Sequence, residues 1–132
     1  MAAALELWHD IVRTGDVSAL DRLLDDAVIF ESPVVHTPQA GKALTAGYLR
    51  AAMLVLNNGR FSYLNEWVGP ASAVLEFTTD VDGIAINGVD IISWNEAGRI
   101  THFKVMVRPL KAITILHQKM GELLAAAAHP PR

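Results

Sequence analysis

Hydrophobic and polar residues alternate along this chain with two different periods. Apolar residues recur every three or four positions in some segments, which predicts amphipathic helices at residues 2–14, 17–24, 41–57 and 110–127. Other segments are largely apolar and are bounded by Gly, Pro, Asn or Asp, which predicts strands at residues 28–32, 60–68, 71–81, 83–94 and 99–107.

The order of these elements indicates a single α+β domain. Two helices, a strand and a helix precede four strands joined by short turns. We expect the strands to form a cone-shaped, curved antiparallel sheet wrapped around the N-terminal helices, because a long meander twists. An extra C-terminal helix follows. No repeat or linker divides residues 1–132, and residues 125–132 are expected to be a frayed tail.

The late strands carry apolar side chains on both of their faces. The segment 83–94 has Ala85, Val89 and Ile91 on one face, and Met106 in the next strand lies opposite its apolar neighbours. A sheet with one wet face alternates more cleanly between apolar and polar residues. We therefore expect a homodimer formed through the sheet, detectable as a dimeric mass by light scattering.

Composition and charge argue against several classes of binding partner. Hydrophobic residues make up 52% of the chain and charged residues 19%, as in a globular domain, and the net charge of −3 argues against nucleic acid. The sequence has no cysteine, no signal peptide and no apolar run long enough for a membrane, so we expect a cytoplasmic protein. The histidines show no metal-ligand spacing, so no metal site is predicted.

Asp90 is the main candidate for chemistry. Since side chains alternate along a strand, Asp90 shares the more apolar face of segment 83–94 with Ile86, Ile92 and Trp94. A carboxyl group there needs a partner, a proton or a cavity. It is either an acid that serves a ligand or a structural group bonded to Trp8, Tyr48 or Tyr63. Asp90→Asn is expected to keep the fold but weaken ligand binding or turnover.

Other residues are predicted to surround Asp90. The first strand's spacing predicts that Ser32 points inward and Glu31 outward, whereas a slipped register would make Glu31 a base. His36, in a loop, is either a weak catalytic candidate or an exposed histidine. Glu66 and Glu76 are assigned to outward faces, although the assignment of Glu66 depends on register. The predicted pocket residues are Trp8, Phe30, Ser32, Tyr48, Tyr63, Phe77, Ile92, Trp94, Phe103 and Val105, and Trp67 joins the aromatic residues expected in the cavity or core.

Several local strings resemble the nuclear transport factor 2-like superfamily, in its SnoaL-like and ketosteroid isomerase-like branch. They are Gly15-Asp16, Asp25-Asp26-Ala27-Val28, Glu31-Ser32-Pro33, Gly41-Lys42, Gly88-Val89-Asp90 and the segment from Trp94 to Ile100. The resemblance covers roughly residues 5–110. It implies a cone with a deep pocket, and a function among isomerases, cyclases, dehydratases, hydrolases or binding domains that need no metal or cofactor.

The ketosteroid isomerases provide a test of individual positions. They use a tyrosine on the first helix, an aspartate base after the first strand and a protonated aspartate on a late strand. By resemblance, these positions fall on Trp8, Ser32 and Asp90, so only the last is kept, and isomerisation by that mechanism is not expected. SnoaL-like cyclases resemble the chain about as closely, and Asp90 is the residue best placed for their pocket acid.

Two functions remain open. The first is a pocket protein that binds or acts on a small, mainly apolar or aromatic molecule without a cofactor, with Asp90 as polar anchor or acid. The second is a non-catalytic ligand-sensing or dimerising association domain in which Asp90 is structural. A cavity of roughly 300 Å³ or more would favour the first, and a filled interior the second.

Overall fold

The protein folds as an α+β cone in the computed structural model, which describes residues 2–128. The chain runs through α1 (Ala3–Thr14), the short 3₁₀ helix η1 (Val17–Ala19), α2 (Leu20–Leu23), β1 (Leu24–Glu31), β2 (Gln39–Ala40), α3 (Lys42–Leu56), β3 (Ser62–Val68), β4 (Ser72–Val81), β5 (Ile84–Trp94), β6 (Ile100–Arg108) and α4 (Leu110–Ala128).

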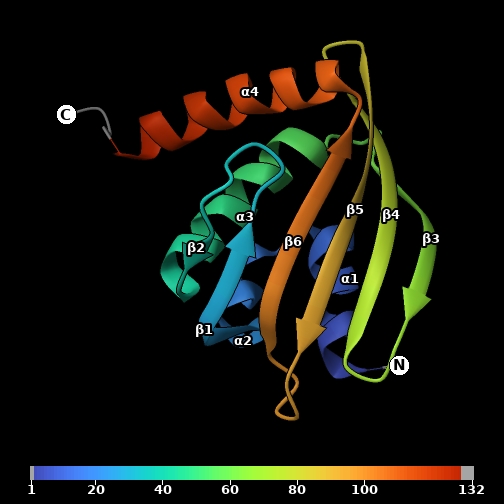
Figure 1. The fold of residues 1–132 in the computed structure, drawn as a ribbon, viewed down its shortest axis with the longest axis vertical. Helices are drawn as coiled ribbons and strands as arrows, with labels where there is room; N and C mark the ends of the chain where they lie inside the picture. The colour runs from blue at the N-terminus through green and yellow to red at the C-terminus, as the bar shows by residue number, and fades with distance from the viewer. Residues whose placement is uncertain (1, 129–132) are drawn as a thin grey trace.

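The strands form one curved sheet in the order β2-β1-β6-β5-β4-β3 (Figure 1). Strands β3 to β6 form the predicted antiparallel meander. Strand β1, however, pairs with β6 in parallel, so the sheet is mixed rather than wholly antiparallel. Parallel pairing needs a long connection between the two strands, and here the rest of the domain supplies it.

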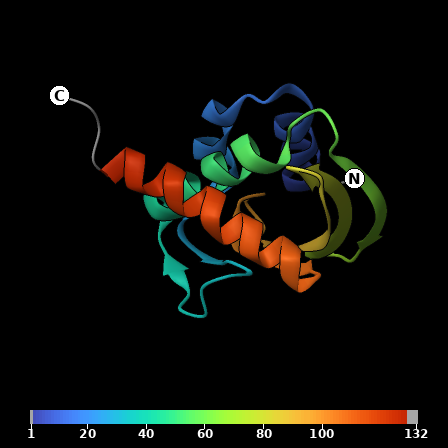
Figure 2. The same ribbon diagram turned by 90° about the horizontal axis from the view of Figure 1, so that it is seen from above.

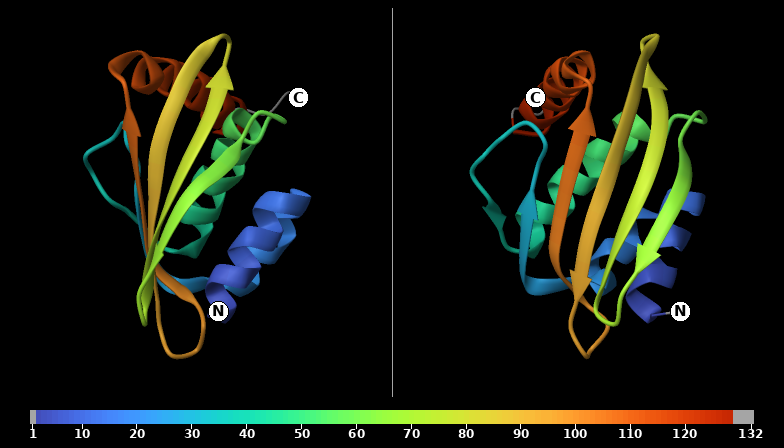
Figure 3. Two further views of the ribbon diagram at one scale, coloured as in Figure 1. Left: turned by 90° about the vertical axis from the view of Figure 1, so that its right-hand side faces the viewer. Right: turned by 45° about the vertical axis from the view of Figure 1, so that its right-hand side comes forward.

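Helices cover one face of this sheet. Figure 3 shows α1 and α3 on the concave side, and Figure 2 shows α4 crossing the end of the cone. The main core lies between these helices and the sheet and includes Leu5, Leu49 and Phe103. A second cluster beneath α4 contains Phe77 and Leu116. Helix α4 includes residues 125–128, and the remainder of the predicted frayed tail, 129–132, lies outside the described residues.

Strand β5 has the alternation that the sequence predicts. From Ile86 to Trp94 every even-numbered residue is buried and every odd-numbered residue is only partly buried. Asp90 is therefore on the inner face, where it is 6% exposed. This register fixes the direction of the carboxyl group because a shift by one residue would turn it outward.

The first strand begins earlier than predicted. Leu24, which the apolar spacing assigns to the second helix, is the first residue of β1. The register of β1 against β6 shifts between Leu24 and Ile29, and the two aspartates at 25 and 26 occupy the irregular part. The irregularity interrupts the alternation of inward and outward side chains, so the sequence pattern predicts only the regular end of the strand, from residue 28 onward.

A bulge in β3 overturns two orientation predictions. Tyr63 pairs with Phe77 and Asn65 pairs with Glu76, which leaves Leu64 as the additional residue. Residues after a bulge change faces. Glu66, predicted to point outward, instead contacts His9 on α1. Trp67, predicted to lie in the cavity or core, is 58% exposed on the opposite face. Glu76 points outward as predicted, bonded to Asn65 and Asn87.

The convex face of the sheet has an apolar centre. Trp67, Val74 and Ile91 form a row across three strands, and Val89 pairs with Met106 beside them. The side chains of Trp67 and Met106 are more than half exposed. No helix covers this face within residues 2–128, as Figure 3 shows. The dimer prediction assumed apolar side chains on the outer face of the sheet, and the structure has them there. The dimer itself stays a prediction.

Candidate functional site

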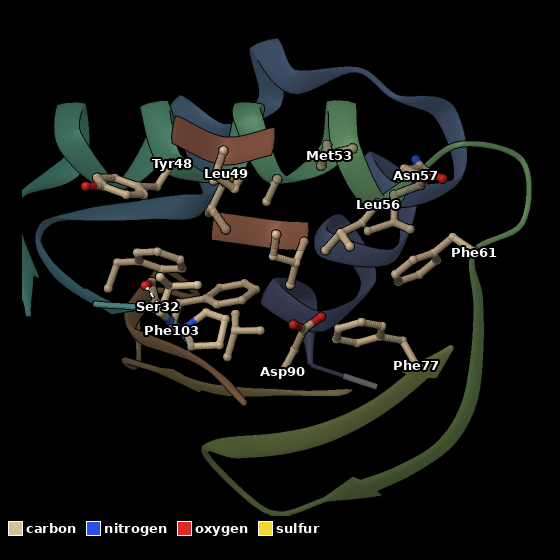
Figure 4. A pocket seen from close by; sticks show the side chains of 18 of the residues that line it. Ser32, Tyr48, Leu49, Met53, Leu56, Asn57, Phe61, Phe77, Asp90 and Phe103 are labelled. Carbon is tan, nitrogen blue, oxygen red and sulfur yellow. Dashed lines mark hydrogen bonds between the residues drawn. The ribbon is translucent and has the colours of Figure 1, made fainter. Parts of the chain in front are cut away.

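A cavity of about 240 Å³ lies inside the cone, between α3, α4 and the concave face of the sheet. Figure 4 looks into it, with α3 above and the strands below. The volume is somewhat smaller than the 300 Å³ expected for a pocket protein, but the interior is not filled. Its walls are mainly apolar, with contributions from Leu49, Met53, Leu56, Phe77, Phe103 and Val105.

Asp90 is the one carboxylic acid among the described residues that line this cavity. Figure 4 shows its carboxyl group projecting from the sheet, between Phe77 and Phe103. Burial raises the pKa of Asp90 from 3.8 to about 7, although a hydrogen bond from Tyr63 opposes the shift. Both protonation states are therefore populated near neutral pH, so the group can donate or accept a proton.

A hydrogen-bonded chain from two other elements holds Asp90 in place. Trp8 on α1 donates its indole N–H to the Tyr63 hydroxyl over 2.9 Å. Tyr63 on β3 donates its own proton to Asp90 Oδ2 over 2.7 Å. Burial, followed by the nearby Asp90 charge, raises the pKa of Tyr63 well above 10, so Tyr63 stays protonated. Asp90 Oδ1 has no partner among residues 2–128 and remains able to bond a ligand.

This chain of bonds combines two alternatives that the sequence left separate. Asp90 is bonded to Tyr63, as in the structural alternative, and it also lines the cavity, as in the functional one. The first-helix position where the isomerase resemblance calls for a tyrosine holds Trp8, whereas Tyr63 supplies a hydroxyl group from β3. The sequence offered Trp8, Tyr48 and Tyr63 as partners of Asp90 without choosing among them, and the fold selects Tyr63.

Aromatic rings shape the wall beside Asp90. Phe61 stacks on Phe77 with ring centroids 5.2 Å apart, and it meets Tyr63 edge-on at 5.0 Å. The ring of Phe77 lies against the backbone of Gly88, where an added Cβ would be 2.5 Å from the ring. Only glycine allows the Phe77 ring to approach the backbone this closely. Gly88 precedes Asp90 by two positions on β5, so the ring and the Asp90 side chain lie on the same face of the sheet.

The structure brings most of the predicted pocket residues together. Eight of the ten line the cavity: Trp8, Phe30, Ser32, Tyr48, Tyr63, Phe77, Phe103 and Val105. Ile92 and Trp94 do not, because α1 packs against this end of β5 and fills it as core. His36 is exposed on its loop and is not part of the lining, which matches the alternative of an exposed histidine.

Ser32 and Glu31 face opposite sides, as the spacing predicts. Glu31 bonds to His102 over 2.6 Å on the convex face. Ser32 lines the cavity, but its Oγ accepts hydrogen bonds from the backbone N–H groups of Val34 and Val35. Ser32 thus shapes the loop after β1, and it is not the carboxylate base found at this position in the isomerases.

Sequence reasoning missed several lining residues. Phe61 lies just before β3, and Leu49, Met53 and Leu56 come from α3. The most important omission is His117 on α4, which brings an imidazole side chain to the cavity. It lies four residues after Ile113 and three before Met120, so it borders the predicted apolar stripe of α4, and this spacing could have revealed it.

The described residues give no indication of a metal site or a membrane span. Within residues 2–128, no three His, Cys, Asp or Glu side chains are grouped so that they could hold a metal ion. None of the helices in this range is long and apolar enough to cross a membrane.

Comparison with known proteins identifies the family. The sequence profile of the SnoaL-like domain matches residues 5–103, three quarters of the chain. The chain belongs to the SnoaL-like domain family. A crystal structure described as a steroid delta-isomerase from Pseudomonas aeruginosa shares 34% identity with this SnoaL-like domain, at a TM-score of 0.90, and the alignment covers 96% of this chain and 92% of that one.

Other solved structures share the fold of this SnoaL-like domain. An uncharacterized protein with a cystatin-like fold from Silicibacter pomeroyi is 28% identical at a TM-score of 0.89, covering 97% of this chain and 89% of that one. A putative polyketide cyclase from Sinorhizobium meliloti is 14% identical at a TM-score of 0.64, covering 80% and 95% respectively, which is a likeness of fold alone. A search of curated proteins gave no match.

Proposed function

We propose that this SnoaL-like domain binds a small, mainly apolar molecule and moves a proton on it without a cofactor, with Asp90 as polar anchor and general acid or base. The observation that carries the proposal is the position of Asp90: one carboxyl oxygen is fixed by Tyr63 and the other is free beside a cavity. A carboxyl group with a pKa of about 7 is suited to acid–base work at neutral pH.

The chemistry that fits this site is enolisation of a ketone. The Asp90 carboxylate removes a proton from the carbon beside the carbonyl, which leaves an enolate and a protonated Asp90. Protonated Asp90 then returns the proton to another carbon of the enolate, and the carboxylate is restored. Tyr63 remains protonated and holds Asp90 Oδ2, so the reacting oxygen keeps its direction.

The walls of the cavity support the choice of ligand. Aromatic and aliphatic side chains surround Asp90 and suit a flat apolar body. At about 240 Å³ the cavity is smaller than the roughly 300–1,000 Å³ typical of drug-sized ligands. A ketone with one or two rings is therefore the favoured class. The likeness to a protein described as a steroid delta-isomerase supports ketone chemistry.

Proton exchange on 2-tetralone tests this function. In D₂O near pH 7, the protein should accelerate loss of the proton signal at the carbon beside the carbonyl, measured by NMR. Asp90→Asn should slow the exchange by about 100-fold, within the range expected for losing a positioned acid or base. Glu76→Gln, a change on the convex face, serves as control. Equal exchange in the Asp90→Asn variant and the unchanged protein would disprove the assignment.

One observation favours a second function, that of a ligand-sensing or association domain without catalysis. Among the described lining residues Asp90 has no second carboxylate beside it, and the Ser32 hydroxyl is occupied by the backbone. Saturable binding of 2-tetralone without any accelerated exchange would support this alternative.

A further inference from the structure

Most polar side chains on the cavity wall already form hydrogen bonds within the protein. Trp8, Tyr63 and Asp90 bond to one another, and Ser32 bonds to its own loop. The amide of Asn57 donates to the Val12 carbonyl oxygen. Each of these groups has a structural partner.

Two lining side chains, Tyr48 and His117, make no hydrogen bond within residues 2–128. Figure 4 shows the Tyr48 hydroxyl at the outer end of its ring, pointing away from Asp90. His117 comes from α4, the helix that crosses the end of the cone (Figure 2). It is exposed to solvent and also lines the cavity, so it lies at the entrance.

One face of α4 forms this entrance. His117, Met120, Gly121 and Leu124 all line the cavity, and their spacing of three and four residues places them on one side of the helix. Asp90 on β5 is buried and His117 on α4 is exposed, so the two polar groups lie at different depths of a mainly apolar cavity. A ligand that touches both must carry polar atoms at both of its ends.

Gly121 adds an independent observation. A Cβ atom at this position would have no heavy atom within 4 Å, so no close contact requires a glycine. Glycine inside a helix is less favourable than alanine by roughly 0.5–1 kcal/mol. Gly121 is exposed, so the space beside it opens to solvent at the entrance, one turn of helix after His117.

We infer that the ligand of this SnoaL-like domain carries a second oxygen group, a carboxylate, at the end remote from Asp90, and that His117 binds this group in the space that Gly121 leaves. The imidazole ring has an N–H donor in both its neutral and its protonated state, so it can bond a carboxylate in either. This inference rests on the proposed function, because it assumes that Asp90 binds the other end.

Two bicyclic probes test the inference by isothermal titration calorimetry at pH 6. They are 2-naphthol, with one oxygen, and 6-hydroxy-2-naphthoic acid, which adds a carboxylate at the far end of the same rings. The unchanged protein should bind the acid about tenfold more tightly, as expected for one hydrogen bond to a charged group. His117→Leu should abolish this preference, taken as the ratio of the two affinities within each protein.

Two further variants complete the test. Gln118→Leu, on the same helix but outside the cavity lining, should keep the preference. Gly121→Leu should fill the open space and remove the preference. Equal affinity for the two probes in the unchanged protein, or a preference that survives His117→Leu, would overturn the inference alone. If neither probe binds, both the inference and the proposed function are wrong.

Discussion

Replacing Asp90 by asparagine should make the protein more stable than the unchanged chain in alkaline solution. The folded state holds the Asp90 proton with a pKa of about 7, whereas the unfolded chain releases it near 3.8. Between these values the folded state binds more protons than the unfolded state, so the Asp90 contribution to stability falls as pH rises, and it levels off above pH 7. Asparagine has no such proton and can still accept the Tyr63 hydrogen bond.

The size of the effect follows from the two pKa values. A difference of one in pKa between the folded and unfolded states changes the free energy of unfolding by 1.36 kcal/mol. The difference between 3.8 and about 7 therefore corresponds to about 4 kcal/mol, and about 3 kcal/mol of this stability is lost between pH 5 and pH 8.5. Urea unfolding of both proteins across this range gives the difference in free energy of unfolding directly, and other titrating groups cancel in it.

Glu76 provides the control, because its pKa is lowered in the folded state whereas that of Asp90 is raised. Hydrogen bonds from Asn65, then Asn87, lower the pKa of Glu76, so its contribution is present at high pH and is lost as pH falls through that pKa. Glu76→Gln should therefore lose stability relative to the unchanged protein as pH rises from acid toward neutral. Parallel pH curves for Asp90→Asn and the unchanged protein would show that Asp90 is not buried as described.

Three further outcomes are expected. Tyr63→Phe should raise the pKa of Asp90 further in a ¹³C NMR titration of its carboxyl carbon, because the bond that lowers it is lost, and should cost about 1–3 kcal/mol in urea unfolding. Gly88→Ala should destabilise the fold by about 1–3 kcal/mol by calorimetry, since its Cβ would lie 2.5 Å from the Phe77 ring; unchanged stability would contradict this packing. If the convex face forms a dimer, Trp67→Glu should reduce the mass seen by light scattering from two chains to one, and a monomeric unchanged protein would exclude that dimer.

The regular parts of the fold could be predicted from local patterns. The inward direction of Asp90 follows from the alternation along β5, and Asp16 caps the helix after α1 by accepting a bond from the Ser18 backbone N–H. In both cases the deciding interactions lie within a few residues along the chain. Short-range pattern is sufficient for such features.

The rest depends on contacts between distant residues. The bulge at Leu64 turns Glu66 inward and Trp67 outward, yet nothing in the spacing of β3 indicates an additional residue. The bond from Tyr63 to Asp90 joins two strands that are not neighbours, since β4 lies between them. Such pairings follow from the curvature of the whole sheet, which a local window does not contain.

The parallel pairing of β1 with β6 governs when the interior can close during synthesis. Phe30 is matched with Phe103, so one wall of the cavity joins an early strand to one of the last segments made. Bringing such distant segments together is entropically costly and slows folding. A nascent chain that lacks β6 leaves the hydrogen-bonding edge of β1 unpaired, and an open strand edge of this kind is prone to pair with another chain while the protein is being translated.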